Sequence, residues 1–405
     1  MWRFESVHER SQTRSLDEVM SWVECDGHVF SHAQSLIDAA VAQEPLIAQS
    51  LKTPQDIRYH AEGPVLYDHL QLMLAFLFAV VEEKVHLIDI EEFRRLKGYE
   101  GEIEELEEML KEHVSFFQVF ILCHDVAKWP CVSFTSRKGS KGESLGFQTP
   151  RIHVYDQAAP ERMKRLNDYL NLYQEFSTGQ EKDSDRETQS HFYLTYGIDV
   201  HYPHHARKIH SPVFEALLNR FSQAHQLPSR DQEMLGDLIA HHMEFGADFL
   251  QVRPSRIERY VHLSSRRGYD ADDFIDLLQG CLLLDHVVGS KRLNPHGYWH
   301  DPSSLIHCLK SEHDYAPHRR AQKELERENR EKKERLQLFK EAGLDGVALM
   351  DLLEMDPGPE FGLVLRRIHA AILGQGNLPK FGEQIDQELE TRIAAFYQKI
   401  FPQGD

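Results

Sequence analysis

Apolar residues recur along most of the chain at the three- and four-residue spacing of amphipathic helices, and alternating runs rich in valine, isoleucine and threonine are rare. This pattern predicts an all-α fold. We expect one or two helices within residues 15–50, including Val29 to Ala40, and a helix from Val65 to Val81. A further helix includes Phe117 and is ended or kinked by Pro130. The remaining expected helices run from His205 through Phe221, from about Asp231 to Phe249, and from Ala271 to Val288 with Asp270 as N-cap.

The helical pattern and the changes in composition predict three parts. These are an N-terminal helical segment (1–50), a helical-bundle domain with an insertion at about 133–195 (51–315), and a connecting helix with a small C-terminal helical unit (316–405). Residues 319–341 mix Lys or Arg with Glu at the i, i+4 spacing that stabilises an exposed helix. Residues 102–113 form an acidic run, for which we expect a solvated helix face.

The insertion contains two polar segments. Residues 136–144 are basic and rich in glycine, but they lack the Gly-Lys-Ser/Thr of a P-loop. A flexible loop and a lid that contacts phosphate are both consistent with this composition. Residues 179–190 are charged, and we expect them to form a surface excursion.

Composition and charge narrow the possible functions. The chain has 405 residues, a formal net charge of −19 and five scattered cysteines. The acidic balance argues against broad, non-specific binding of nucleic acid but leaves open a small phosphorylated substrate held by metal. We expect no membrane partner, because no apolar run approaches the roughly 20 residues that cross a bilayer. The odd cysteine count and the lack of a signal-peptide pattern favour reduced thiols in a cytoplasm, with the oligomeric state left open.

Five predicted helices carry ionisable side chains on a face that is otherwise apolar. These side chains are His69, His124 with the adjacent Asp125, His205, His242 and Asp285. A single histidine on such a face is ordinarily a core residue whose hydrogen bonds are satisfied. Here five helices share the feature, and two of them carry carboxylates. This predicts that the groups converge on one or two divalent cations. The mixture of imidazole and carboxylate suits Mn, Fe, Co, Ni or Zn, with Mg as a further option. We expect His28 and His32, spaced i, i+4, to be an exposed pair instead.

Four segments resemble, in their order, the HD-domain superfamily of metal-dependent phosphohydrolases. The segment 122–130 is similar to the family's hydrophobic-x-His-Asp-x-Gly/Ala-Lys-Pro pattern, with Trp129 as one extra residue. The segment 202–206 is similar to Phe-x-Gly-His-Glu, with His204 in place of Gly and Ala206 in place of Glu. The segment 238–243 resembles the later histidine segment, and Leu284-Asp285 resembles the closing aspartate.

The resemblance implies an HD-domain helical bundle and a specific set of site residues. The implied metal ligands are His69, His124, Asp125, His205, His242 and Asp285, with His241 as an alternative or additional ligand. Asp125 would bridge two metals and act in catalysis together with Lys128, which would meet a substrate phosphate. We also expect Lys208 to bind substrate.

A second resemblance concerns the C-terminal part. Residues 344–350 and 357–365 are similar to the tail that follows the HD domain in bacterial CCA-adding tRNA nucleotidyltransferases and poly(A) polymerases. The segment Pro357-Gly358-Pro359 predicts a rigid turn into a helix, whose free amides would hold a phosphate or simply cap a helix that packs on its neighbours. The nucleotidyltransferase head of those enzymes has no counterpart in the sequence.

The function expected from these features is metal-dependent hydrolysis of a phosphomonoester or a (cyclic) phosphodiester of a nucleotide or RNA end. One alternative is a non-catalytic HD-fold module that binds RNA or protein, which the departures at His204 and Ala206 and the long insertion favour. Another is a metal-dependent oxygenase of the diiron HD branch, in which His204 and His241 would supply additional ligands.

Overall fold

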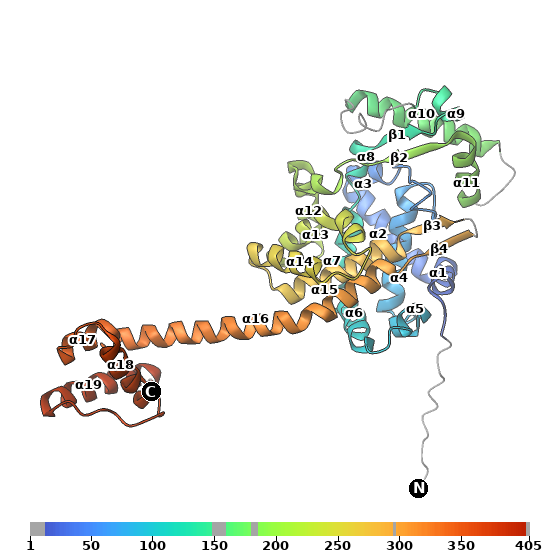
Figure 1. The fold of residues 1–405 in the computed structure, drawn as a ribbon. Coiled ribbons are helices and arrows are strands. Elements are labelled where there is room, and N and C mark those ends of the chain that lie inside the picture. The colour runs from blue at the N-terminus through green and yellow to red at the C-terminus, as the bar shows by residue number, and fades with distance from the viewer. Residues whose placement is uncertain (1–12, 148–158, 180–184, 295–296, 402–405) are drawn as a thin grey trace, which may run out of the picture. The chain divides into compact units, whose positions relative to one another are not determined.

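The computed structural model describes residues 13–147, 159–179, 185–294 and 297–401, and these residues are predominantly helical (Figure 1). Their strands form only two small antiparallel sheets of two strands each, so the all-α prediction is confirmed. The chain divides into two compact units, Met1–Tyr315 and Ala316–Asp405. Helix α16 (Ser303–Glu341) contains the boundary between them.

The first unit is built from helices whose apolar faces share one core. Outside the insertion, its α-helices are α1 (Leu16–Cys25), α2 (Gly27–Gln43), α3 (Pro45–Ser50), α4 (Leu66–Val81), α5 (Glu91–Arg94), α6 (Glu100–Glu112), α7 (Val114–Cys123), α8 (Lys128–Cys131), α12 (Pro212–Ala224), α13 (Ser229–Asp248), α14 (Pro254–Arg267) and α15 (Ala271–Leu282). The shorter elements are the 3-10 helices η1 (Leu87–Asp89) and η3 (Ala206–His210), the π-helix η4 (Leu283–Val288), and the paired strands β3 (Lys291–Asn294) and β4 (Gly297–His300). Leu16, Val29 and Ile47 belong to the common core, so α1 to α3 are part of this unit.

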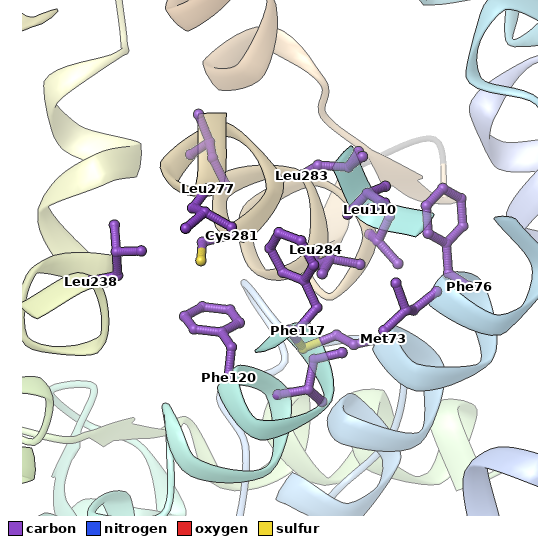
Figure 2. Packing of buried hydrophobic residues seen from close by; sticks show 14 of the residues in the cluster. Met73, Phe76, Leu110, Phe117, Phe120, Leu238, Leu277, Cys281, Leu283 and Leu284 are labelled. Carbon is purple, nitrogen blue, oxygen red and sulfur yellow. The ribbon is translucent and has the colours of Figure 1, made fainter. Parts of the chain in front are cut away.

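Helices α4 and α7 lie at the centre of the core. Both are apolar on nearly all sides, as expected for helices that other helices surround. Figure 2 shows Met73 of α4 and Phe117 and Phe120 of α7 among side chains from α13, α15 and η4. This packing fixes the directions in which the ends of α4 and α7 point.

Residues 205–221 do not form the single helix that the periodicity predicts. The 3-10 helix η3 ends at His210, and α12 begins at Pro212. Proline fits the first turn of a helix but cannot continue a preceding one, because it has no amide hydrogen to donate. Consequently Val213, which the periodicity places on the same buried face as His205, is 63 % exposed.

Three other predicted features need correction. Helix α7 ends at Cys123, well before Pro130, which lies inside the short helix α8. The helix predicted over 271–288 begins as expected at the N-cap Asp270 but changes to the π-helix η4 at Leu283. Within the acidic run of α6, Glu107 is buried and not solvated. Hydrogen bonds from the Leu87 amide and from Lys111 take the place of water at its carboxylate.

The insertion forms a small layer with its own apolar cluster. Its elements are β1 (Ser133–Ser136), α9 (Lys141–Ser144), α10 (Ala159–Thr178), α11 (Asp185–Tyr196) and β2 (Ile198–His201), and β1 pairs with β2. The aromatic side chains of Phe134, Tyr169 and Phe192 pack together at the centre of this cluster. The basic stretch 136–144 is therefore the end of β1, a turn at Gly139 and α9, and none of its residues lines the main cavity described below. Part of the charged segment 179–190 lies outside the described residues.

The second unit contains the C-terminal part of α16 followed by α17 (Gly346–Leu353), α18 (Pro359–Ile372) and α19 (Glu383–Ile400). Phe339 of α16 stacks on His369 and Phe396, which joins α16, α18 and α19 in one small core. Helix α18 starts at Pro359 with Gly358 as N-cap, as the Pro-Gly-Pro segment predicts.

Two expectations from composition can be compared with the described residues. None of the described helices combines the length and the apolarity needed to span a bilayer. All five cysteines are free thiols, and Cys123 and Cys281 are buried as their apolar surroundings suggest, whereas Cys25 is exposed.

Replacing Gly280 by alanine is expected to destabilise the first unit. A Cβ at this position of α15 would lie 2.5 Å from Cζ of Phe117, which is fully buried. Overpacking of this kind costs about 1–3 kcal/mol, which urea denaturation would measure. The matched control is Gly101→Ala in α6, where an added Cβ meets nothing within 4 Å. We expect that change to be neutral or to stabilise by up to about 1 kcal/mol, and equal effects of both changes would contradict the packing argument.

Candidate metal centre

The six side chains that the resemblance implies as ligands lie together in the core of the first unit. His69 comes from α4 and His242 from α13, and Asp285 comes from the π-helix η4. His124 is the C-cap of α7 and Asp125 follows it, and His205 immediately precedes η3. All six are at most 6 % exposed. The π-helix is a conformation that is rare in proteins and is frequent at functional sites.

Asp125 lies between two groups of imidazoles. On its Oδ2 side, the Nε2 atoms of His124 and His69 are 3.4 and 3.8 Å away. Oδ1 of Asp285 is 3.5 Å from Nε2 of His69 and 3.6 Å from Nε2 of His124. On the other side, Oδ1 of Asp125 is 3.0 Å from Nε2 of His205 and 3.5 Å from Nε2 of His242. The six residues therefore form two adjacent donor sets that share one carboxylate.

All four imidazoles have their Nδ1 atoms close to backbone carbonyl oxygens. In His124, His205 and His242 the partner is the carbonyl three residues earlier, at 3.0, 2.8 and 2.7 Å. In His69 it is the carbonyl of Gly289, at 2.8 Å. A carbonyl oxygen only accepts hydrogen bonds, so we assign the proton to Nδ1. A neutral imidazole then directs the lone pair of Nε2 toward the centre, which is the orientation that a metal ligand needs.

This donor set fits one or two divalent transition metals. Four Nε2 lone pairs and two carboxylates within a few ångströms repel one another unless a cation or protons compensate them. Oδ1 of Asp125 is buried and accepts no hydrogen bond from the described residues. Imidazole and carboxylate together suit Mn, Fe, Co, Ni or Zn. One set would hold an ion through His69, His124, Asp125 and Asp285, and the other through Asp125, His205 and His242.

Comparisons with known proteins add no relative. No protein-family model matches the chain, and searches of the curated proteins and of the solved structures find no match either. The arguments that follow therefore rest on the residues and their geometry.

The pKa values in the cluster show what replaces a cation when none is bound. Burial alone would lower the pKa of His124, but the carboxylates of Asp125 and Asp285 outweigh it and raise the pKa to about 10. Burial likewise opposes ionisation of Asp125 and Asp285, yet the ammonium of Lys128 beside Asp125, and the imidazoles of His286, His124 and His69 around Asp285, hold both pKa values well below the usual range. In the metal-free protein, protonated His124 therefore supplies part of the compensating positive charge.

Metal binding is expected to release protons. At pH 8 the imidazole of His124, with a pKa of about 10, is protonated in the metal-free protein, and Nε2 must lose that proton to become a ligand. We expect release of about one proton or more for each protein molecule that binds metal. Titration calorimetry with Mn²⁺ or Zn²⁺ in buffers of different ionisation enthalpy would measure it. A binding heat that does not depend on the buffer would contradict this expectation.

Lys128 lies beside the cluster. Its Nζ is 2.5 Å from Oδ2 of Asp125 and 4.8 Å from the centre of the Tyr202 ring. The Gln55 side chain is a further partner at 3.4 Å, and the residue is only 3 % exposed. An ammonium group held in this way can offset negative charge on the shared carboxylate or on a phosphoryl group near it.

Three other residues that the sequence analysis singles out do not join the cluster. His241 precedes His242 on α13 but turns away from the cluster, and its Nδ1 is 3.3 Å from Oε2 of Glu244. The structure therefore brings His242, and not His241, to Asp125. Lys208 is exposed and does not line the cavity at the cluster. With Cys131 and Arg162 it lines a smaller hollow that shares Pro203, His204 and Arg207 with that cavity. His204 is exposed at the cavity wall and belongs to neither donor set.

A cavity of about 1080 Å³ opens beside the cluster. Asp125, Asp285, His205 and His242 form part of its wall together with Lys128. The remaining wall is mixed and includes the cationic Arg58, Arg207 and Arg292, the serines Ser290, Ser303 and Ser304, and the apolar Met243, Ala247 and Leu250. The space is large enough for a nucleotide-sized ligand.

Sequence reasoning missed two residues that belong to the site. Glu62 and His60 lie in the irregular segment before α4, where no periodic pattern indicates which side chains point inward. Oε1 of Glu62 is 2.9 Å from Nδ1 of His69. Burial opposes ionisation of Glu62, but His60 and His69 together lower its pKa to about 2, so this group is a carboxylate at neutral pH.

Proposed function

We propose that this protein is a metal-dependent phosphohydrolase of the HD type that cleaves a phosphomonoester or a (cyclic) phosphodiester of a nucleotide or RNA end. The observation that carries the proposal is the pair of adjacent donor sets that share Asp125 and open into a large cavity. Two adjacent metal sites are typical of enzymes that hydrolyse phosphate esters. The segments that resemble the HD-domain superfamily supply every one of these donors except His69, which lies upstream on α4.

Residues of the cluster and of the cavity wall would have separate roles in hydrolysis. Divalent ions held by the cluster would lower the pKa of a coordinated water and neutralise phosphoryl oxygens. Asp125 would be a ligand of both ions, and it lines the cavity in which a substrate phosphate would lie. Lys128, already 2.5 Å from Asp125, would offset the negative charge that develops on the phosphoryl group. Arg58, Arg207 and Arg292 also lie on the cavity wall. Each is paired there with a carboxylate, Asp56, Glu244 and Asp301 respectively, and would contact a further anionic group of a substrate only by giving up part of that pairing.

An activity screen tests the proposal. Purified protein would be assayed on p-nitrophenyl phosphate and on bis(p-nitrophenyl) phosphate with Mn²⁺, Ni²⁺, Co²⁺ or Mg²⁺, before and after treatment with a chelator. We expect hydrolysis of at least one ester that chelation abolishes and added metal restores. Bound metal without turnover of any ester would instead favour the non-catalytic module that binds RNA or protein.

A further inference from the structure

A carboxylate and an imidazole next to the metal centre form a pair that metal binding does not explain. Oε1 of Glu62 is 2.9 Å from Nδ1 of His60, the same distance that separates it from Nδ1 of His69. The Glu62 side chain is 1 % exposed and that of His60 is 12 % exposed. Glu62 therefore lies inside the protein and His60 lies between it and the cavity, whose wall includes His60.

The geometry leaves one nitrogen of His60 available to a ligand. Because Nδ1 faces the carboxylate of Glu62, that atom carries a proton, and Nε2 remains. The hydrogen bond of the His60 ring to the described residues is made through Nδ1, and Nε2 makes none. The His60 ring stands edge-on to the His69 ring, with centroids 4.7 Å apart, so it lies directly beside the cluster.

His60, Glu62 and His69 are close enough to be a third cation site, but their hydrogen bonds argue against it. Nδ1 of His69 is already 2.8 Å from the Gly289 carbonyl, and that ring's other nitrogen points to the cluster. A third cation would require His69 to give up the Nδ1 proton that it donates to Gly289, which would leave both ring nitrogens deprotonated. A carboxylate behind an imidazole instead serves to orient the ring and to stabilise its protonated form.

We propose that His60 is a catalytic residue that protonates the leaving group, and that Glu62 is the residue that positions it; this inference rests on the proposed phosphohydrolase function. As water forms the new bond to phosphorus, the bond from phosphorus to the leaving oxygen breaks and its electron pair stays on that oxygen. The proton moves from Nε2 of His60 to the leaving oxygen. The proton that the attacking water loses restores the balance, and no other reactant is needed.

Without a ligand, burial and the ammonium of Lys128 outweigh the carboxylate of Glu62, so the pKa of His60 lies below its usual value. An anionic phosphate ester bound in the same cavity adds a second negative charge near the ring, which favours the protonated imidazole. The proposal itself stands on the position of His60 between Glu62 and the cavity.

The test compares leaving groups in wild-type protein and His60→Asn. An alkyl phosphate needs protonation of its leaving oxygen, whereas p-nitrophenolate leaves readily without it. We expect His60→Asn to slow alkyl phosphate hydrolysis by about 100-fold or more and p-nitrophenyl phosphate hydrolysis by less than about 10-fold. Metal content measured by mass spectrometry should stay at the wild-type value, because His60 is not in either donor set.

Two further variants complete the test: one alters the carboxylate that pairs with His60, and the other is a control away from the cavity. Glu62→Gln retains the side-chain size, and we expect a smaller loss that again falls mainly on the alkyl ester. The matched control is His86→Asn, which removes an imidazole whose Nδ1 is 3.0 Å from Oε1 of Glu107, a similar pair that does not line the cavity. This control should leave both rates unchanged.

The outcomes separate the two proposals. Equal losses on both esters in His60→Asn, or no loss, would overturn the role of His60 while the phosphohydrolase function stands. Loss of metal from folded His60→Asn would overturn it too, since that result would make His60 part of the metal centre. A wild-type protein that hydrolyses neither of these monoesters nor bis(p-nitrophenyl) phosphate with any of the metals would overturn the proposed function and the role of His60 with it.

Discussion

Replacing Asp125 by alanine is expected to reduce phosphoester hydrolysis by at least about 100-fold. Asp125 offers Oδ2 to the side of His69 and His124 and Oδ1 to the side of His205, so its loss removes a ligand from both donor sets at once. Steady-state rates on p-nitrophenyl phosphate and metal content by mass spectrometry would measure the effect. We expect both to fall together.

The same substitution also leaves the buried ammonium of Lys128 without its carboxylate partner, which threatens the fold. Asp125→Asn keeps the volume and separates loss of charge from loss of packing. The matched control is Asp237→Asn, because Asp237 is 3 % exposed against 2 % for Asp125 but pairs with Arg267 and Tyr269 away from the cluster. Wild-type rates in folded Asp125→Ala would refute the assignment of this cluster as the catalytic centre.

Removal of metal is expected to destabilise the first unit by about 3 kcal/mol relative to protein with an ion at about 100 times its Kd. Without the ion, only protons such as the one on Nε2 of His124 compensate the carboxylates of Asp125 and Asp285, and the other imidazoles still face these carboxylates in a buried space. Scanning calorimetry before and after chelation, and again after Mn²⁺ or Zn²⁺ is added back, would measure the change in unfolding temperature.

Two neighbouring histidines provide the control for this experiment. His242→Asn removes a residue 3.5 Å from Asp125 and should weaken the stabilisation by metal. His241→Asn removes a histidine that faces Glu244 and should leave that stabilisation intact. If the His241 variant loses the effect and the His242 variant keeps it, the described cluster is not where the metal binds.

The side chains in the cluster could be selected from the sequence because helical periodicity distinguishes the inward face of a helix. His69 and His242 are polar residues on faces that are otherwise apolar, and burial of such groups requires compensation. The same reasoning holds for Asp285, although its segment is a π-helix and not the α-helix that the pattern predicts. The all-α fold follows from the same periodicity.

Periodicity was less informative where the backbone departs from a regular helix. Ser211 and Pro212 divide the helix predicted over 205–221, because proline has no amide hydrogen for the preceding turn. His60 and Glu62 lie in an irregular segment, where neighbouring side chains have no fixed angular relation. Lys208, which is predicted to bind substrate, is exposed on η3 and does not line the cavity at the cluster.

The sequence by itself determined that the chain is helical and which ionisable groups its helices carry into the core, because these are properties of local periodicity. Only the tertiary structure decided that the groups meet around Asp125, that His242 and not His241 joins them, and that Glu62 and His60 complete the surroundings. The physical reason is that these distances are set by the packing of segments far apart in the chain, such as α4 against η4, for which a single sequence contains no local signal.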